Sequence, residues 1–187
     1  MRQPTVSVII PTLNAEDEIG QLLSLLERQT LTPTEILVVD SSSDDNTAAE
    51  VKKHSSASLI VIDRSSFNHG GTRDLAFRKT TGEIVCFLTQ DAIPESFEYL
   101  ERLIRPILDN KEVVLSSGRQ LPKSDARRFE QLVRSFNYPD IASVRGKEDL
   151  SAYGIKTFLP QMCAPPIVAR HTLRAVVFLR SQQMKIC

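Results

Sequence analysis

Two aspartates follow apolar runs, at positions where a carboxylate is well placed to do chemistry. Asp40 ends the run EILVVD at 35–40, and Asp91 follows the run IVCFL at 84–88. Open α/β sheets bind their ligands at the carboxyl ends of the strands, so we expect both aspartates at one edge of a sheet. A turn residue that caps the next helix is the alternative interpretation of Asp91, and the run alone does not decide between the two.

The segment HGGTR at 69–73 adds a cation and two glycines to these carboxylates. Arg73 is suited to bidentate hydrogen bonds with phosphate oxygens, and the glycines allow the backbone to come close to a ligand. One aspartate would accept hydrogen bonds from a base or ribose, and the other would reach a divalent cation that bridges phosphates. Together the three segments predict a site for a nucleotide diphosphate.

The elements that must position these residues alternate between strands and helices. We expect strands at 6–10, 35–40, 59–62, 84–88 and 113–115, helices at 19–29, 72–79, 97–108 and 125–136, a short helix ending at 53, and a glycine-bearing loop at 67–72. Pro11 is expected to end the first strand, and Asn14 or Asp17 to cap the first helix. Short strand–helix alternation predicts right-handed βαβ units. The predicted fold class is therefore α/β and Rossmann-like, with a mostly parallel central sheet flanked by helices.

The composition indicates a small cytoplasmic domain. The chain of 187 residues has 23 Lys and Arg against 23 Asp and Glu, so no net charge attracts nucleic acid or an anionic membrane. Three cysteines without metal spacing fit a reducing compartment. We expect no signal sequence and no transmembrane segment, because no apolar run is long enough. A Rossmann dinucleotide fingerprint and a Walker A loop are both absent, which disfavours hydride transfer and ATPase chemistry.

Four further residues near these motifs have structural interpretations. Asp45 and Thr47 are expected to cap the helix that follows them rather than contact a ligand. His69 is expected to form hydrogen bonds within its own segment rather than act as a catalytic base. Cys86 lies inside an apolar run and is expected in the core.

The order of these motifs resembles the donor half of the family 2 glycosyltransferases. The motifs are VSVIIPTLN at 6–14, VVDS at 38–41, DNT at 45–47, FNHGGTRD at 67–74 and FLTQDAIP at 87–94. The last two are similar to the rhamnosyltransferase-like branch, and the resemblance covers roughly 5–158. It implies the A-type nucleotide-diphospho-sugar transferase fold. It also implies transfer of a sugar, with inversion, from a nucleotide-diphosphate donor to an acceptor hydroxyl in cell-surface polysaccharide or glycan synthesis.

The resemblance also implies roles for particular residues. The implied nucleotide and donor site consists of Pro11, Thr12, Asn14, Glu16, Asp40, Arg73 and Gln90. Asp91 is implied to hold Mg²⁺ or Mn²⁺ as a single carboxylate, because Thr89 stands where the family's metal motif usually has another Asp. The implied donor is of the dTDP or UDP type with rhamnose as its sugar, and the acceptor is a saccharide or a lipid-linked molecule. The implied location is the cytoplasm, including the inner face of the membrane.

Residues 159–187 depart from this resemblance. In this family the general base is an Asp well downstream of the metal motif, but no Asp or Glu follows Phe158, and the ragged apolar pattern predicts no strand. Reading the codons one base out of step permits Gly-Gly-Phe across 175–178 and Asn-Glu-Asp-Met across 183–187. Both strings resemble the acceptor segment and acidic pair of the family. We therefore expect a donor-binding domain at 1–158 and an aberrant tail at 159–187, frameshifted or truncated, which lacks the catalytic base.

Two other functions share this layout. A non-catalytic remnant of the donor domain would serve at most as a nucleotide-binding or assembly module. A sugar-1-phosphate nucleotidyltransferase would need a Gly-rich loop after the first strand, where this chain has PTLN at 11–14.

Overall fold

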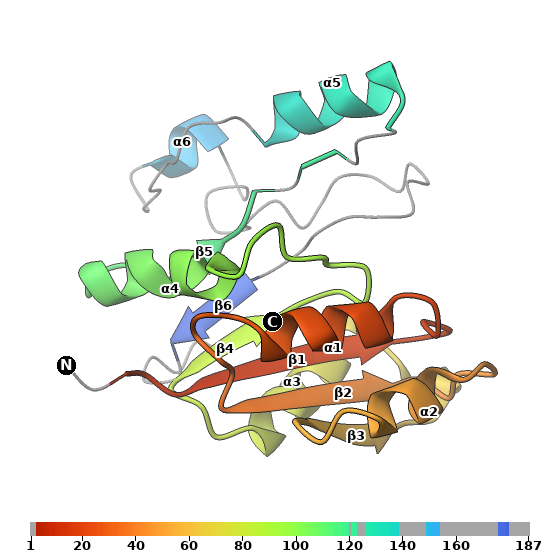
Figure 1. Ribbon diagram of the computed structural model, residues 1–187. Helices are drawn as coiled ribbons and strands as arrows, with labels where there is room; N and C mark the ends of the chain where they lie inside the picture. Colours follow the sequence, from red (N-terminus) through yellow and green to blue (C-terminus); the bar gives the residue numbers. More distant parts are fainter. Residues whose placement is uncertain (1–2, 120, 123–125, 139–148, 154–175, 180–187) are drawn as a thin grey trace.

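The computed structural model describes residues 3–119, 121–122, 126–138, 149–153 and 176–179 (Figure 1). Its strands are β1 (Val6–Thr12), β2 (Glu35–Asp40), β3 (Ala57–Val61), β4 (Ile84–Phe87), β5 (Leu115–Ser117) and β6 (Val176–Leu179). Its helices are α1 (Ile19–Glu27), α2 (Thr47–Lys52), α3 (His69–Lys79), α4 (Tyr99–Asp109), α5 (Arg128–Asn137) and α6 (Leu150–Tyr153), with a 3-10 helix η1 (Arg64–Ser66).

The described strands form one sheet in the order β3-β2-β1-β4-β6-β5. β1 pairs in parallel with β2 and β4, and β2 pairs in parallel with β3. β6 runs antiparallel to both of its neighbours, β4 and β5. The prediction of a mostly parallel α/β sheet flanked by helices is confirmed. The strand order reverses between β1 and β4, which is the place where an open sheet leaves a crevice for a ligand.

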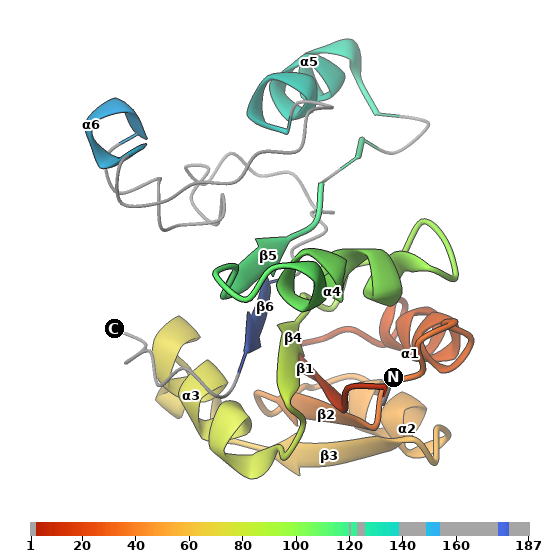
Figure 2. The same ribbon diagram turned by 90° about the vertical axis from the view of Figure 1, so that its left-hand side faces the viewer.

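Neighbouring residues of each strand point to opposite faces of the sheet, so the protein has two apolar layers. Val8 packs in the larger layer with Leu23 of α1 and Ile104 of α4. The next residue of β1, Ile9, packs in the smaller layer with Ala76 of α3. Figure 2 shows α3 on one side of the sheet and α1 and α4 on the other. Because both faces are covered, the strands are continuous apolar runs rather than alternating ones.

The first strand is longer than expected, because it continues through Pro11 to Thr12. β4 pairs with β1 only as far as Ile9 opposite Phe87. The carbonyls of Ile9 and Thr12 point toward β4 and β2 respectively, so Pro11 faces the β4 side, beyond that ladder. The missing N–H of Pro11 therefore costs no bond of the sheet.

The expected caps of the first helix are wrong. α1 begins at Ile19, and its N-cap residue, Glu18, makes no side-chain capping bond. The carbonyl of Ala15 instead accepts the N–H groups of Glu18 and Ile19 at 3.1 and 2.9 Å. Neither Asn14 nor Asp17 is therefore needed to begin α1.

The glycine-bearing segment is largely helical rather than a loop. α3 begins at His69, so Gly70 and Gly71 lie in its first turn. Asn68 is the N-cap, and its side-chain oxygen accepts the N–H of Gly71 at 2.6 Å. A Cβ on Gly71 would come within 2.9 Å of that oxygen. The capping asparagine offsets the low helix propensity of the two glycines, so the prediction of a loop at 67–72 is wrong.

A carboxylate joins three segments at the opposite edge of the sheet, where the strands begin. One oxygen of Glu35 accepts hydrogen bonds from Ser7 Oγ at 2.6 Å, from the N–H of Thr81 at 2.6 Å and from the N–H of Gly82 at 3.1 Å. Burial opposes ionisation of Glu35, but these bonds outweigh it and lower the pKa of the carboxyl group below its ordinary value. We call these four residues the amino-edge knot.

The remaining bounds differ from expectation by a few residues. β3 begins at Ala57 and β5 at Leu115, each two residues away from the predicted start. Cys86 lies in the core as expected, where burial raises the pKa of its thiol to about 12. No helix among the described residues is both long and apolar enough to cross a bilayer.

Four residues of the expected tail belong to the sheet. The sequence pattern after Phe158 predicts no strand, yet Val176–Leu179 forms β6 and pairs with β4 from Val176 opposite Phe87 to Leu179 opposite Ile84. The sequence VVFL has the β-branched and aromatic residues that strands favour. The remainder of 159–187 lies outside the described residues. The division at 158 and the out-of-frame tail therefore remain predictions.

Candidate functional site

The segments that follow β1, β2 and β4 meet at the carboxyl edge of the sheet and border two cavities. The larger cavity has a volume of about 600 Å³ and the smaller one about 150 Å³. Pro11, Phe67 and Gln90 line both. The larger is also lined by Asn14, Asp17, Glu18, His69, Arg73, Thr89 and Asp91, and the smaller by Thr12, Leu13, Ser41 and Arg64. The structure thus brings together the segments from which the sequence predicted a site.

The larger cavity contains charges of both signs. Arg73 and His69 come from the first turns of α3, and Arg73 Nη1 donates to the His69 carbonyl at 2.9 Å. The same nitrogen lies 3.3 Å from His69 Nδ1, and the imidazole meets the ring of Phe67 edge-on at 5.2 Å. These contacts agree with the expectation that His69 forms hydrogen bonds within its own segment. Asp91 lies at the turn that follows β4 and lines the same cavity.

Asp40 is almost fully buried, with 2 % of its surface exposed. Its Oδ1 accepts hydrogen bonds from the hydroxyls of Thr12 and Ser43, and its Oδ2 accepts the N–H of Ser43 at 2.9 Å. The carboxylate therefore ties the segment after β2 to the end of β1. Asp40 thus has a structural role in the loop that follows β2.

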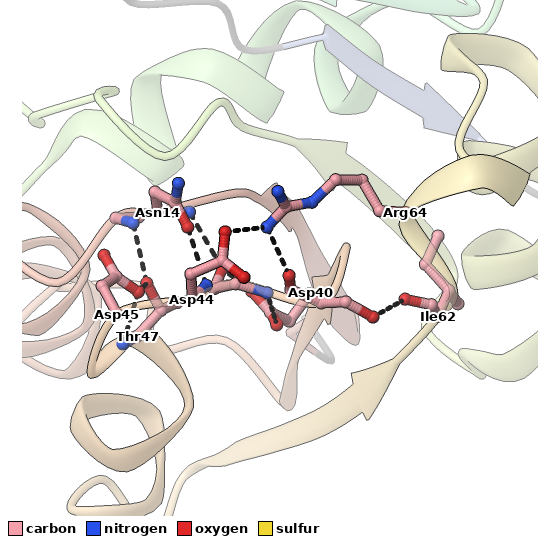
Figure 3. Close-up of polar contacts among 10 residues, drawn as sticks. Asn14, Asp40, Asp44, Asp45, Thr47, Ile62 and Arg64 are labelled. Atoms are coloured by element: carbon pink, nitrogen blue, oxygen red, sulfur yellow. Dashed lines mark hydrogen bonds and ion pairs between the residues drawn. The ribbon is translucent and has the colours of Figure 1, made fainter.

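Asn14 connects the segments after β1 and β2 in both directions. Its N–H donates to Ser43 Oγ at 2.9 Å, and its side-chain oxygen accepts the N–H of Asp44 at 2.9 Å (Figure 3). The N–H of Ala15 donates to Thr47 Oγ1 at 2.7 Å. Asn14 has a φ of 50°, a left-handed conformation that asparagine tolerates better than most residues. Its side-chain oxygen is thus used to shape the neighbouring loop.

Glu16, two residues later, also connects the segments after β1 and β2 by hydrogen bonds in both directions. Its N–H donates to Asp45 Oδ2 at 3.0 Å, and its Oε2 accepts the N–H of Asn46 at 2.8 Å. Asp45 Oδ1 accepts the N–H of Thr47 at 2.9 Å, but the N-cap residue of α2 is Asn46, so the expectation that Asp45 and Thr47 cap this helix is wrong. We call the bonds between residues 14–16 and 43–47 the loop clasp. It joins the segment after β1, where Asn14 lines the larger cavity, to the segment after β2.

Gln90 forms a second connection across the edge, between the turn after β4 and the end of β1. Its side-chain oxygen accepts the N–H of Leu13 at 2.9 Å, and its amide nitrogen donates to the Leu13 carbonyl at 3.2 Å. A ligand contact was implied for Gln90 by the resemblance, but both ends of this amide are engaged with the backbone. Gln90 thus couples the turn that carries Asp91 to the wall of the smaller cavity.

Two polar residues of the smaller cavity, Ser41 and Arg64, were not among the predicted site residues. Arg64 Nη2 donates to the Ser42 carbonyl at 2.6 Å and to Asp44 Oδ2 at 2.7 Å (Figure 3). Arg64 belongs to η1, directly after β3, and lies in no motif. A cation just past the carboxyl end of a third strand was the available signal, by the same strand-end rule that selected Asp40 and Asp91.

The residues at the carboxyl edge of the sheet suit a divalent cation that is also bound by the phosphates of a ligand. Among the described residues, no group of three or more His, Cys, Asp or Glu side chains is placed to hold a metal ion. Asp91 nevertheless lines the larger cavity together with the Thr89 hydroxyl. Mg²⁺ is commonly held by one or two carboxylates together with substrate phosphates. Asp91 is suited to contribute one such carboxylate.

The profile of the glycosyl transferase family 2 matches residues 7–159, so the chain belongs to that family. The match covers β1 to β5 and both segments of the loop clasp. Two solved structures share the fold. A mannosyltransferase from Pyrobaculum calidifontis, solved with GDP-mannose and Mn²⁺, has 28% identity and a TM-score of 0.53 over 61% of this chain and 35% of that one. The TarS protein of S. aureus has 29% identity and a TM-score of 0.52 over 59% and 34%. The expected A-type fold is confirmed.

Two curated relatives are named O-antigen chain rhamnosyltransferases. The one from Salmonella typhimurium is 37% identical over 153 residues, which are 81% of this chain and 48% of the relative. The one from Salmonella anatum is 36% identical over 156 residues, which are 82% and 49%. The chain thus spans about half the length of these relatives. The expected likeness to the rhamnosyltransferase branch of the family is confirmed.

Proposed function

We propose that this chain binds a nucleotide-diphospho-sugar and belongs to an inverting glycosyltransferase of O-antigen or related polysaccharide synthesis. The observation that carries the proposal is the larger cavity at the carboxyl edge of the sheet, which both Arg73 and Asp91 line. A guanidinium and a metal-binding carboxylate are the groups that a diphosphate needs. The names of the rhamnosyltransferase relatives favour rhamnose as the sugar, and we propose dTDP or UDP as its carrier.

In this proposal the residues of the chain bind and orient the donor. Thr12, Asp40 and Pro11 border the base and ribose, and Arg73 pairs with the diphosphate. Asn14, Glu16 and Gln90 hold the surrounding segments in place through the loop clasp and the Leu13 contact. Asp91 would hold Mg²⁺ or Mn²⁺, which would neutralise charge on the departing diphosphate.

The acceptor side of the reaction requires a base that removes the proton of the acceptor hydroxyl. No Asp or Glu follows Phe158 in this sequence. We propose that this chain binds the donor, with a saccharide or lipid-linked molecule as the acceptor of the family reaction. Its place of action would be the cytoplasm or the inner face of the membrane.

Calorimetric titration of the chain with dTDP and UDP, each with and without Mn²⁺, tests the proposal. We expect heat with at least one nucleotide and tighter binding when Mn²⁺ is present. A chain that gives no heat in any of the four combinations would be a folded remnant without a donor site. A hydrolysis assay with dTDP-rhamnose then measures how fast the bound donor is cleaved when no acceptor is present.

A further inference from the structure

The smaller cavity has the size and lining of a pocket for one flat ring. Its volume is about 150 Å³, which is the size of an engineered protein cavity that holds benzene. Pro11, Leu13 and Phe67 give it apolar walls. A whole nucleotide does not fit such a space, but a six-membered base does. In the proposed function the diphosphate lies in the larger cavity, which shares three lining residues with this one.

A buried hydroxyl on the wall of this cavity has no partner. Ser41 is 2 % exposed, and its Oγ forms no hydrogen bond with any described residue. Buried hydroxyl groups are almost always satisfied, and an exception calls for an explanation such as a missing ligand. A hydroxyl both donates and accepts, so Ser41 can bond with a ring carbonyl or with a ring N–H.

Arg64 brings a second polar group to the same wall, and it can only donate. Its two bonds, to the Ser42 carbonyl and to Asp44, use Nη2 and leave the N–H groups of Nε and Nη1 to solvent or a ligand within the described part of the chain. Figure 3 shows the Arg64 side chain reaching from the end of β3 across to the segment after β2. A donor at this position favours a ring carbonyl and disfavours the amino group of cytosine, because two donors would face each other.

We propose that Ser41 and Arg64 determine the base specificity of the donor site and select a pyrimidine with two ring carbonyls, uracil or thymine. The proposal rests on the proposed function, since it assigns the base of that same donor. Ser41 satisfies its hydroxyl on the base and supplies affinity. Arg64 donates to a ring carbonyl and supplies the discrimination against cytosine.

Titrations with dTDP, dCDP and pyrophosphate test the proposal in the wild type, Ser41→Ala, Arg64→Met and Asp44→Asn. The wild type is expected to prefer dTDP over dCDP several-fold, because the half-exposed Arg64 guanidinium loses a ring carbonyl as its acceptor. Ser41→Ala should weaken dTDP about tenfold and leave pyrophosphate unchanged. The melting temperature of the unliganded Ser41→Ala protein should stay equal or rise by about 2–4 °C, because an unsatisfied buried hydroxyl has been removed.

Arg64→Met should lower the ratio of dTDP to dCDP affinity several-fold. Asp44→Asn is the matched control, because it weakens the support of Arg64 while the Arg64 donors remain, and it should keep the ratio. The proposal is overturned if Ser41→Ala binds dTDP like the wild type, if it weakens pyrophosphate equally, or if the wild type does not distinguish dTDP from dCDP. A wild type that binds pyrophosphate but no nucleoside diphosphate would also overturn it. A wild type that binds none of the three would overturn the proposed function itself.

Discussion

The side-chain amide of Gln90 and the backbone of Leu13 are paired in both directions, as two neighbouring strands would be. The oxygen of the amide accepts at 2.9 Å and its nitrogen donates at 3.2 Å. β4 itself stops pairing with β1 at Phe87, opposite Ile9. Gln90 therefore extends the contact between the two segments past the end of the ladder. The turn that carries Asp91 is consequently connected to the wall of the smaller cavity.

Replacing Gln90 with Met tests this coupling. Methionine has a similar length but cannot form either bond, so we expect a loss of about 0.5–1.5 kcal/mol in the free energy of unfolding. Binding of dTDP should weaken several-fold, since the loops lose part of their fixed geometry. Gln21→Met, at an exposed position of α1, is the control and should change neither quantity. Equal dTDP affinity in Gln90→Met and the wild type would mean that Gln90 does not position these loops for the nucleotide.

Asp91 is expected to account for the metal dependence of nucleotide binding. In Asp91→Asn the tightening of dTDP binding by Mn²⁺ should fall by about tenfold or more, the effect of removing one member of a close charge pair. Asp17→Asn is a matched control, because Asp17 lines the same cavity and carries the same charge. Calorimetry at several Mn²⁺ concentrations measures how Mn²⁺ changes dTDP binding in the two variants. If Asp17→Asn loses the metal effect and Asp91→Asn keeps it, the assignment of the metal ligand is wrong.

The amino-edge knot should make stability depend on pH. The folded state lowers the pKa of Glu35, so its contribution to stability is present above the unfolded-state pKa of about 4.3 and is lost as the pH falls through the lower folded value. At pH 7, Glu35→Gln should reduce the free energy of unfolding by about 1–2 kcal/mol. The difference from wild type should shrink as the pH is lowered from 5 toward about 3. Urea unfolding across this range measures it.

Glu112→Gln serves as the control for that experiment, because Glu112 is exposed. Its unfolding curve should follow that of the wild type at every pH. A difference between wild type and Glu35→Gln that stays constant down to pH 3 would mean that the carboxylate of Glu35 is not ionised preferentially in the folded state.

Gly82 is expected to tolerate no side chain. A Cβ at this position would lie 2.3 Å from Ser7 Oγ and 2.6 Å from the Ser7 nitrogen, which belongs to the backbone of β1 and cannot move aside. We expect Gly82→Ala to cost about 2–4 kcal/mol in the free energy of unfolding. Gly20→Ala is the control, since its nearest neighbour is a glutamate oxygen at 3.6 Å and alanine favours the helix. That variant should gain about 0.5–1 kcal/mol, as measured by urea unfolding.

The sequence predicted the sheet because its strands are buried on both faces and therefore appear as uninterrupted apolar runs. The strand-end rule then placed Asp40 and Asp91 correctly at one edge, without knowledge of any contact between them. The predicted bounds of the strands were less accurate where they depend on pairing with a neighbouring strand. β1 continues through Pro11 because it pairs with β2 as far as Thr12 opposite Asp40, and no pattern within 6–12 contains that information.

The local sequence also does not predict where a polar side chain points. Asn14, Glu16 and Gln90 were expected to meet a ligand, but each forms bonds with a segment 29 to 77 residues away in the chain. Those bonds satisfy backbone groups that no strand or helix reaches, which is a requirement of the folded chain alone. Ser41 and Arg64 were missed for the same reason, since their importance arises from a cavity and not from a motif.

The loop clasp also constrains how such a site can be recombined or engineered. Each of its two segments supplies side chains that complete the backbone of the other, as Asn14 does for Asp44 and Glu16 does for Asn46. A graft of residues 13–18 from a relative would therefore bring side chains matched to a partner that is not there, and the same holds for 41–47. Chimeras that exchange both segments together should fold, whereas those that exchange one should not. We therefore expect the two loops to be exchangeable between relatives only as a pair.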